Sequence, residues 1–205
     1  NINMEYINRF LETKIKGYLK TREIIAIVGP RQCGKTTLME HIFKELKNAL
    51  FISFEDQKKL ALFDTDIDSF IEMYAKNYNY LFIDEFQYSK EGGKKLKYIF
   101  DNYKTKIFIS GSSVSELSIQ SIKYLVGRIF IFNLYPLSFS EFLSYKNNSL
   151  FEIYAKNKKL FSEIISQINK YYWEFLIYGG YPRVVLSKSK EEKETVLRNI
   201  YNTYI

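Results

Sequence analysis

Five short runs of β-branched and aromatic residues recur along the chain, and most of them are separated by segments of helical length. The runs cover residues 23–29, 49–55, 80–85, 106–112 and 128–134. Nearly continuous apolar character over so few residues is typical of strands that are buried on both faces of a parallel sheet. Apolar residues at helical spacing mark segments 36–48, 66–77 and 92–104. This alternation predicts a doubly wound α/β domain.

The pattern changes after Pro136. Three segments with helical spacing follow, at residues 138–146, 149–179 and 190–205, and the sequence "GGYPRVV" interrupts them at 179–185. We therefore expect an α/β core at residues 1–137 and a helical lid at 138–205. The last segment reaches Ile205 without a Gly or Asn cap or a Pro stop, so we expect a further C-terminal region in the natural protein.

The amino-acid composition limits the class of protein to which the chain can belong. The chain has 205 residues, of which 46% are hydrophobic and 18% aromatic, which favours a packed globular protein over a disordered one. No stretch approaches the roughly 20 apolar residues of a membrane helix, and the first residues lack the apolar core of a signal peptide. The single cysteine excludes an intrachain disulfide and fits a reducing compartment. These features predict a cytoplasmic location and no membrane contact.

The charge balance leaves two interpretations open. The formal net charge is +7, from 30 Lys and Arg against 23 Asp and Glu, and a basic surface attracts nucleic acid. However, the lysines are scattered along the chain, and the abundance of Lys, Asn, Ile and Tyr is what an AT-rich genome would produce. DNA is therefore a candidate partner and not a conclusion.

The sequence "GPRQCGKTT" lies between the first predicted strand and the first predicted helix. It contains G-x-x-x-x-G-K-[ST], in which glycines let backbone N–H groups wrap phosphates at a helix N-terminus. Lys35 would reach the β- and γ-phosphates, and the Thr36 hydroxyl would ligate Mg²⁺. The alternative is an ordinary glycine-containing turn. We expect the whole loop to bind ATP, through Gly29, Pro30, Arg31, Gln32, Cys33, Gly34, Lys35, Thr36 and Thr37.

Cys33 lies inside this loop and has two interpretations. It is a small residue that faces the helix, or its thiolate is stabilised by the helix N-terminus and reactive. The second interpretation predicts that alkylation blocks nucleotide binding and that bound ATP protects the thiol.

Two neighbouring carboxylates end the third predicted strand, in "YLFIDEFQ". Asp84 is placed to hold the Mg²⁺ shell, and Glu85 to polarise the attacking water as a general base. Gln87 is a candidate for orienting water or a partner. The fourth strand ends in "ISGSS", where Ser110 and Ser112 are candidates to sense the γ-phosphate, with Ser112 preferred. The alternative for the serines is a turn that leads to a helix N-cap.

Together these residues resemble P-loop ATPases of the AAA type, above all the archaeal ATPase group, with kinship to signal-transduction and initiator ATPases. The likeness covers nearly the whole chain, because "INRFLE", "GPRQCGKTTL", "LFIDEFQ", "ISGSS", "LVGR", "LYPLSFSEFL" and "GGYPRVV" follow in the expected order. The resemblance implies a five-stranded sheet of order 5-1-4-3-2, with the Walker B carboxylate on the third strand.

The resemblance also implies three further site residues. Arg128 in "LVGR" matches an arginine that senses the γ-phosphate or acts as a finger across a subunit interface, which would require a homo-oligomer. Pro182 in "GGYP" is similar to a lid proline that packs on adenine, with Gly180 allowing the close approach. Arg9 in "INRF" would border the base.

The leading functional hypothesis is a regulatory Mg²⁺-dependent ATPase in which ATP joins core and lid and acts on an unknown protein partner. The alternative is a DNA-dependent ATPase, such as a loader, a remodeller or a mobile-element protein. A small-molecule kinase is disfavoured because the sequence shows no cluster of lid arginines.

Overall fold

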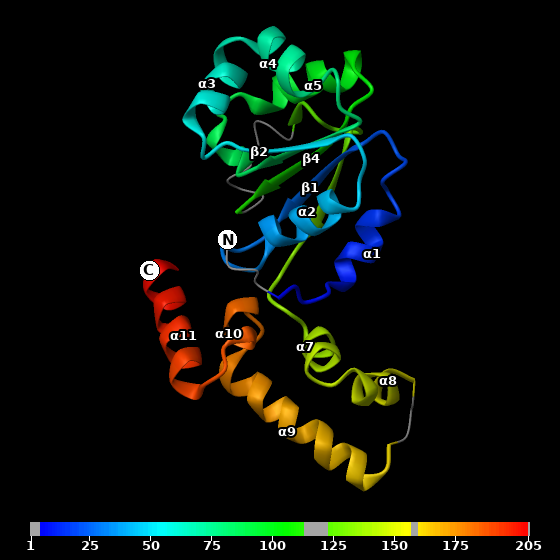
Figure 1. The fold of residues 1–205 in the computed structure, drawn as a ribbon, viewed down its shortest axis with the longest axis vertical. Coiled ribbons are helices and arrows are strands. Elements are labelled where there is room, and N and C mark those ends of the chain that lie inside the picture. Colours follow the sequence, from blue (N-terminus) through cyan, green and yellow to red (C-terminus); the bar gives the residue numbers. More distant parts are fainter. Residues whose placement is uncertain (1–4, 113–122, 157–159, 205) are drawn as a thin grey trace. The chain divides into compact units, whose positions relative to one another are not determined.

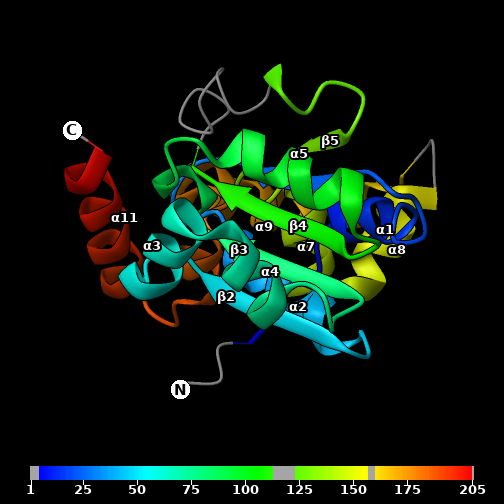
Figure 2. The ribbon, with the colours of Figure 1, turned by 90° about the horizontal axis from the view of Figure 1, so that it is seen from above.

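A five-stranded parallel sheet forms the centre of the α/β part, in a computed structural model that describes residues 5–112, 123–156 and 160–204. The sheet order is β2-β3-β4-β1-β5, and every neighbouring pair is parallel. This confirms the expected order 5-1-4-3-2, of which β2, β3 and β4 are seen side by side in Figure 2. Each strand lies within its predicted run: β1 Ile24–Val28, β2 Ala49–Ser53, β3 Tyr80–Asp84, β4 Lys106–Gly111 and β5 Ile129–Asn133.

The strand residues alternate between two apolar layers. On one face, Ala26, Ile83 and Ile109 join a core cluster with residues of α3 (Gln57–Thr65), α4 (Ile67–Tyr74) and α5 (Gly92–Asn102). The other face carries a row of aromatic rings, in which Phe82 stacks on Phe108 with ring centroids 4.3 Å apart. The two views show α3, α4 and α5 above the strands (Figures 1 and 2). Burial on both faces explains why these strands read as continuous apolar runs.

Helix α2 (Lys35–Lys44) continues from the phosphate loop and packs below the same sheet. Its Phe43 contacts the rings of Phe51 and Phe82 edge-on, with centroids 5.7 and 5.8 Å away. Helix α1 (Phe10–Lys16) precedes β1 and buries Ile15 completely. Packing against β2 and β3 therefore fixes α2, and with it the end of the phosphate loop.

Three short elements described in the α/β part were not predicted: α1, α3 and a 3₁₀ turn, η1. Helix α3 begins after Asp56, whose carboxylate accepts a hydrogen bond from the Lys58 N–H as an N-cap, and η1 covers Phe86–Tyr88. The Asp56 cap was a readable signal, whereas a single 3₁₀ turn leaves little trace in a sequence.

The C-terminal part is helical, as expected, but it is more divided than its pattern suggested. Its elements are α7 Phe139–Lys146, α8 Asn148–Lys156, α9 Ser162–Tyr178, α10 Pro182–Leu186 and α11 Lys190–Tyr204. The predicted segment 149–179 contains two helices, and residues 157–159 between them lie outside the described ones. Ser138 and Glu141 form a capping box that starts α7. Pro182 starts the short helix α10, where a missing N–H costs nothing.

The chain divides into two compact units. One contains Leu11–Arg31 and Lys35–Leu134; the other contains Asn1–Phe10, Gln32–Gly34 and Tyr135–Ile205. Three residues of the phosphate loop therefore group with the helical part, which the predicted boundary between residues 137 and 138 does not anticipate. Within the described ranges, no helix is long and apolar enough to cross a membrane.

Candidate functional site

The phosphate loop connects the end of β1 to the first turn of α2. Its backbone has positive φ at two residues, Gln32 (62°) and Gly34 (95°). The conformation is left-handed at Gln32, where most side chains are disfavoured, and Gly34 adopts it freely. Such backbone turns direct successive N–H groups to one side and create a concavity for anions.

Lys35 lies buried at the base of this loop, with 6% of its surface exposed. Its ammonium donates hydrogen bonds to the carbonyl oxygens of Gly29 at 2.9 Å and Pro30 at 3.0 Å. Both acceptors belong to the loop itself. The cation is therefore held against the backbone of the loop, where an anion bound by the loop would meet it.

The next residue, Thr36, joins the loop to the end of β3. Its hydroxyl donates to Asp84 Oδ2 at 2.7 Å, and the hydroxyl of Ser110 donates to the other carboxylate oxygen of Asp84. Asp84 is buried, with 5% of its surface exposed. Its carboxylate is held in position because each oxygen accepts a hydrogen bond from a hydroxyl group. A hydroxyl oxygen and a carboxylate are the hard ligands that Mg²⁺ takes in P-loop proteins, so these residues fit that ion.

Glu85 follows Asp84 in a left-handed backbone conformation, with φ 54° and ψ 44°. Its N–H donates to Ser110 Oγ at 2.9 Å, and its carboxylate accepts a hydrogen bond from the Gln87 amide. Left-handed non-glycine residues cost free energy and gather at functional sites. The turn moves the Glu85 side chain out of the alternation of β3 and leaves it partly exposed.

Gln87 connects Glu85 to the end of β4. The same amide nitrogen lies 3.3 Å from Ser112 Oγ, while Gln87 Oε1 is buried and has no hydrogen-bond partner. No other side-chain nitrogen or oxygen in the described ranges is buried in this state. Sequence reasoning preferred Ser112 to Ser110, but the structure gives the direct contacts with Asp84 and Glu85 to Ser110.

Arg9 is buried against the loop, but its guanidinium is engaged with protein groups. Nη1 donates to the Cys33 carbonyl at 2.8 Å, Nε donates to Glu141 at 3.2 Å, and Nη2 donates to the Tyr135 carbonyl. Because these acceptors occupy all three nitrogens, the geometry favours a role in bracing the loop. Sequence reasoning missed Glu141, although its capping-box spacing from Ser138 is readable.

In the structure Pro182 lies beside Gly34 of the loop, and Gly180 packs closely against the backbone of Leu137. A Cβ at Gly34 would lie 3.7 Å from Pro182 Cγ and 3.8 Å from Arg9 Nη1. At Gly180, a Cβ would lie 2.1 Å from the Leu137 carbonyl oxygen, and the Leu137 N–H donates to the Gly180 carbonyl at 2.7 Å. Gly180 therefore allows a close approach to the Leu137 backbone, and its role beside adenine stays a prediction.

Arg128 lies at the opposite end of the sheet from the phosphate loop. It precedes β5, where its carbonyl accepts the Ile24 N–H at 2.7 Å, and its side chain pairs with Asp101 at 2.9 Å. This hydrogen bond lowers the pKa of Asp101. Because the strands are parallel, the amino end of β5 lies beside the amino end of β1, far from the loop. The expectation of a γ-phosphate sensor within the same chain is wrong, and a role across a subunit interface stays a prediction.

The remaining loop residues differ in exposure. The Cys33 side chain is completely buried, which favours its interpretation as a small packing residue and makes rapid alkylation of the folded protein unexpected. Gly29 and Pro30 are partly exposed, and Arg31, Gln32 and Thr37 are exposed. Contact of these residues with nucleotide stays a prediction.

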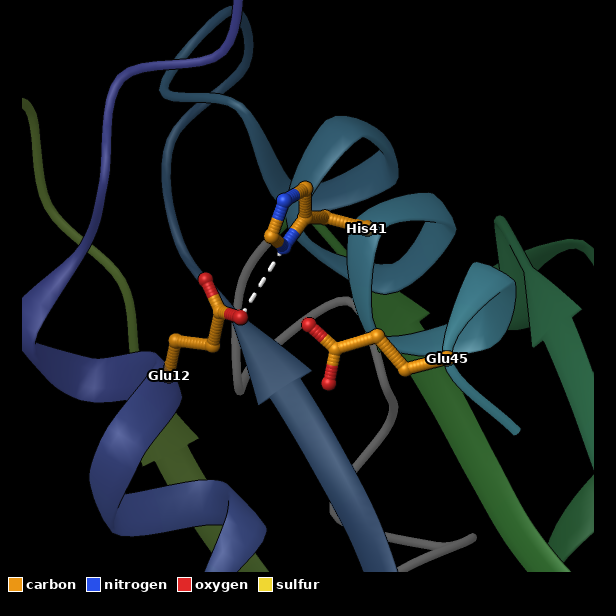
Figure 3. A group of neighbouring side chains, drawn as sticks. All are labelled: Glu12, His41 and Glu45. Carbon is orange, nitrogen blue, oxygen red and sulfur yellow. Dashed lines mark hydrogen bonds and ion pairs between the residues drawn. The ribbon is translucent and has the colours of Figure 1, made fainter.

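A charged cluster that the sequence analysis did not single out joins α1 to α2 (Figure 3). His41 Nδ1 lies 2.9 Å from Glu12 Oε1, and the side chains of Glu12, His41 and Glu45 approach one another closely. The Lys16 ammonium lies 2.7 Å from both carboxylates, and these hydrogen bonds raise the pKa of Lys16. Since Lys16 already supplies the positive charge, we assign the cluster as an ion-pair network. Glu12 and Lys16 are four residues apart, as are His41 and Glu45, and this (i, i+4) spacing was visible in the sequence.

Comparison with known proteins agrees with this geometry. Residues 21–143 match the family described as AAA domain (AAA_14). An uncharacterized protein of Methanocaldococcus jannaschii, MJ1544, is 31% identical over 94% of this chain and 42% of its own length. An uncharacterized protein of Haemophilus influenzae is 28% identical over 98% of this chain and 48% of its own length. The chain thus spans less than half of either relative.

Two solved structures share the fold. PCH-2 of C. elegans superposes with a TM-score of 0.52 at 16% identity, over 95% of this chain and 63% of that one. The ORC2 protein of Aeropyrum pernix, solved in its ADP form, gives a TM-score of 0.54 at 12% identity, over 97% and 71%. Identities this low support the fold alone. With the family match over more than half of its residues, the chain belongs to the AAA domain family and has the fold of its P-loop ATPases.

Proposed function

We propose that the chain hydrolyses ATP with Mg²⁺ and uses the reaction to change the state of its helical part. The observation that carries the proposal is the hydrogen bond between Thr36 and Asp84, which places a hydroxyl and a carboxylate beside the buried Lys35. The three side chains come from the two segments that P-loop ATPases use for nucleotide and metal.

Each side chain has a defined task in binding. Lys35 would leave the loop carbonyls for the β- and γ-phosphates, while the loop N–H groups hold the phosphate oxygens. Thr36 and Asp84 would hold Mg²⁺, which neutralises charge on the phosphates when it is bound. Ser110 keeps the Asp84 carboxylate in one orientation through its hydroxyl.

Glu85 is the proposed general base. A water oxygen attacks the γ-phosphorus and gives its proton to the Glu85 carboxylate, while the bond from the γ-phosphorus to the β–γ bridging oxygen breaks and ADP leaves. The left-handed turn and the Gln87 amide orient this carboxylate. A positioned base contributes about 10²- to 10⁴-fold to such a step.

The contacts of the loop centre support the proposed change of state. Arg9 hydrogen-bonds both the Cys33 carbonyl and Glu141 of α7, and Pro182 of α10 lies beside Gly34. A ligand that reshapes the loop would therefore act directly on the residues that hold α7 and α10. Differential contacts of this kind are what a nucleotide switch requires.

The test compares wild type, Glu85→Gln and Lys35→Ala in Mg²⁺-ATP binding and hydrolysis. We expect Glu85→Gln to bind ATP normally and to turn over about 100-fold more slowly or worse, and Lys35→Ala to lose binding. Glu91→Gln, an exposed change on the loop before α5, is the control. Turnover of Glu85→Gln equal to wild type would remove Glu85 from the mechanism.

A second candidate is an ATPase that nucleic acid stimulates. The net charge of +7 favours it. Adding single-stranded or duplex DNA to the hydrolysis assay separates the two functions, because the first candidate predicts a rate that does not respond to DNA.

A further inference from the structure

A basic pocket lies at the amino ends of the sheet strands, within the α/β unit. Its volume is about 520 Å³, and it is formed by the loop before β1, the turn before β3 and the turn before β4. The phosphate loop lies at the carboxyl end of β1, so the basic pocket is distinct from the ATP site. The lining residues are Leu19, Lys20, Thr21, Arg22, Lys76, Tyr78, Asn79, Tyr80, Tyr103, Lys104, Thr105 and Lys106.

The charged side chains that line this pocket are all positive. Five of the residues are cations, and none is a carboxylate. Lys76, in the turn after α4, pairs with Glu72 of that helix, and Arg22 donates to the carbonyl oxygens of Phe100 and Tyr103. Lys20 and Lys104 are exposed, and no carboxylate within the described ranges forms an ion pair with them. Their charges are available to an anion.

Lys106 adds a buried charge to the floor of the pocket. It is 6% exposed, and its ammonium donates to the carbonyl and hydroxyl oxygens of Thr21 and to the Glu23 carbonyl. Burial lowers the pKa of Lys106 to about 8. The Glu23 carboxylate also attracts this ammonium, and an anion in the pocket would be attracted by the same buried charge, because low-dielectric surroundings strengthen the interaction.

Three tyrosines stand among the cations. Tyr78, Tyr80 and Tyr103 are half-buried and line the pocket, and the exposed Asn79 side chain lies between the first two in sequence. Cations alone suit any polyanion, whereas aromatic rings interleaved with cations suit one that also carries planar bases. The volume lies within the range of pockets that bind small ligands, about 300–1,000 Å³, which is room for nucleotide units and not for a duplex.

We propose that this basic pocket binds single-stranded nucleic acid, with Lys20 and Lys104 on phosphates and the tyrosine rings against bases. Stacking on every base and contact with every phosphate make such binding tolerant of sequence. The site does not depend on the proposed ATPase mechanism, since none of its residues touches the phosphate loop residues named above.

The experiment measures fluorescence anisotropy of a labelled 20-nucleotide single strand with the nucleotide-free protein, over a series of salt concentrations. The test variant is Lys20→Gln/Lys104→Gln. The control is Lys58→Gln/Lys90→Gln, which removes the same charge from exposed lysines outside the pocket. A second test variant, Tyr78→Leu, removes one ring and keeps the charge.

We expect tight binding by wild type and the control, and at least tenfold weaker binding by Lys20→Gln/Lys104→Gln. The slope of log K against log salt should fall by about 1.4, at about 0.7 for each phosphate contact in a single strand. Tyr78→Leu should weaken binding about fivefold or more with an unchanged slope, because a stacked base contributes about 1–3 kcal/mol.

Two outcomes would overturn the proposal. One is equal binding by the test and control pairs of lysine variants. The other is equally tight binding of inorganic polyphosphate and no effect of Tyr78→Leu, which would reduce the pocket to a general anion site. Each variant is first shown to bind ATP as wild type does, so failure here and failure of the ATPase proposal are distinguishable.

Discussion

At the scale of single residues, the site depends on side chains that hold other side chains. Ser110 touches both Asp84 and the Glu85 N–H, and Gln87 holds the Glu85 carboxylate. Neither residue is part of a phosphate-loop motif. Sequence spacing located the carboxylates, because they directly follow the apolar run of β3, but the ranking of Ser110 and Ser112 required the register of β4 beside β3.

Gln87 provides the first prediction at this scale. Gln87→Ala removes the amide that orients Glu85, so we expect kcat for ATP to fall about 10- to 100-fold, as small misplacements of a catalytic group do. The KM for ATP should stay unchanged, since the Gln87 amide is hydrogen-bonded to Glu85 and Ser112, which lie outside the phosphate loop. Steady-state hydrolysis gives both constants, with Gln57→Ala on α3 as the control. A rise in KM without loss of kcat would contradict the positioning role.

At the scale of elements, α2 connects the loop to the rest of the α/β unit. It starts at Lys35, packs Phe43 on the sheet, and joins α1 through the ion-pair network of Glu12, Lys16 and His41. The helix was predictable from its apolar spacing. Its contact with α1 was not predictable, because the packing of α1 against α2 decides which charged residues form ion pairs.

The network gives a prediction for these two helices. Lys16→Met should lower the free energy of unfolding by about 1–2 kcal/mol, because it removes the cation that pairs with the buried Glu12 carboxylate. The matched control Lys76→Met breaks an exposed pair with Glu72 and should cost less, because solvent screens an exposed ion pair. Urea unfolding of both variants measures the difference. Glu12→Gln in the Lys16→Met background should recover part of the loss, and equal losses in both single variants would dismiss the network.

At the scale of the whole molecule, two compact units share one phosphate loop. Gln32–Gly34 group with the helical residues, whereas Lys35 and the residues up to Arg31 group with the sheet. A nucleotide held by Lys35 would stabilise the folded state that binds it, so we expect its binding to raise the stability of the chain.

Thermal unfolding tests this expectation. Saturating Mg²⁺-ATP should raise the Tm of wild type, because a ligand at 100 times its Kd adds about 2.7 kcal/mol to the stability of the state that binds it. Lys35→Ala should lose the shift. Lys44→Ala, at the exposed end of the same helix, should keep it. A full shift in Lys35→Ala would place the nucleotide elsewhere.

The sequence by itself determined the strands, their parallel order through the family resemblance, and the loop with its following carboxylates. These depend on local pattern: apolar runs buried on both faces, and motif residues at fixed spacing. Only the tertiary structure decided which distant groups meet. It places Arg128 at the end of the sheet opposite the phosphate loop, where it pairs with Asp101. It shows that Arg9 pairs with Glu141 and hydrogen-bonds the phosphate loop. It also shows that three separate turns form the basic pocket. Such contacts depend on packing between segments remote in sequence, which periodicity along one segment does not record.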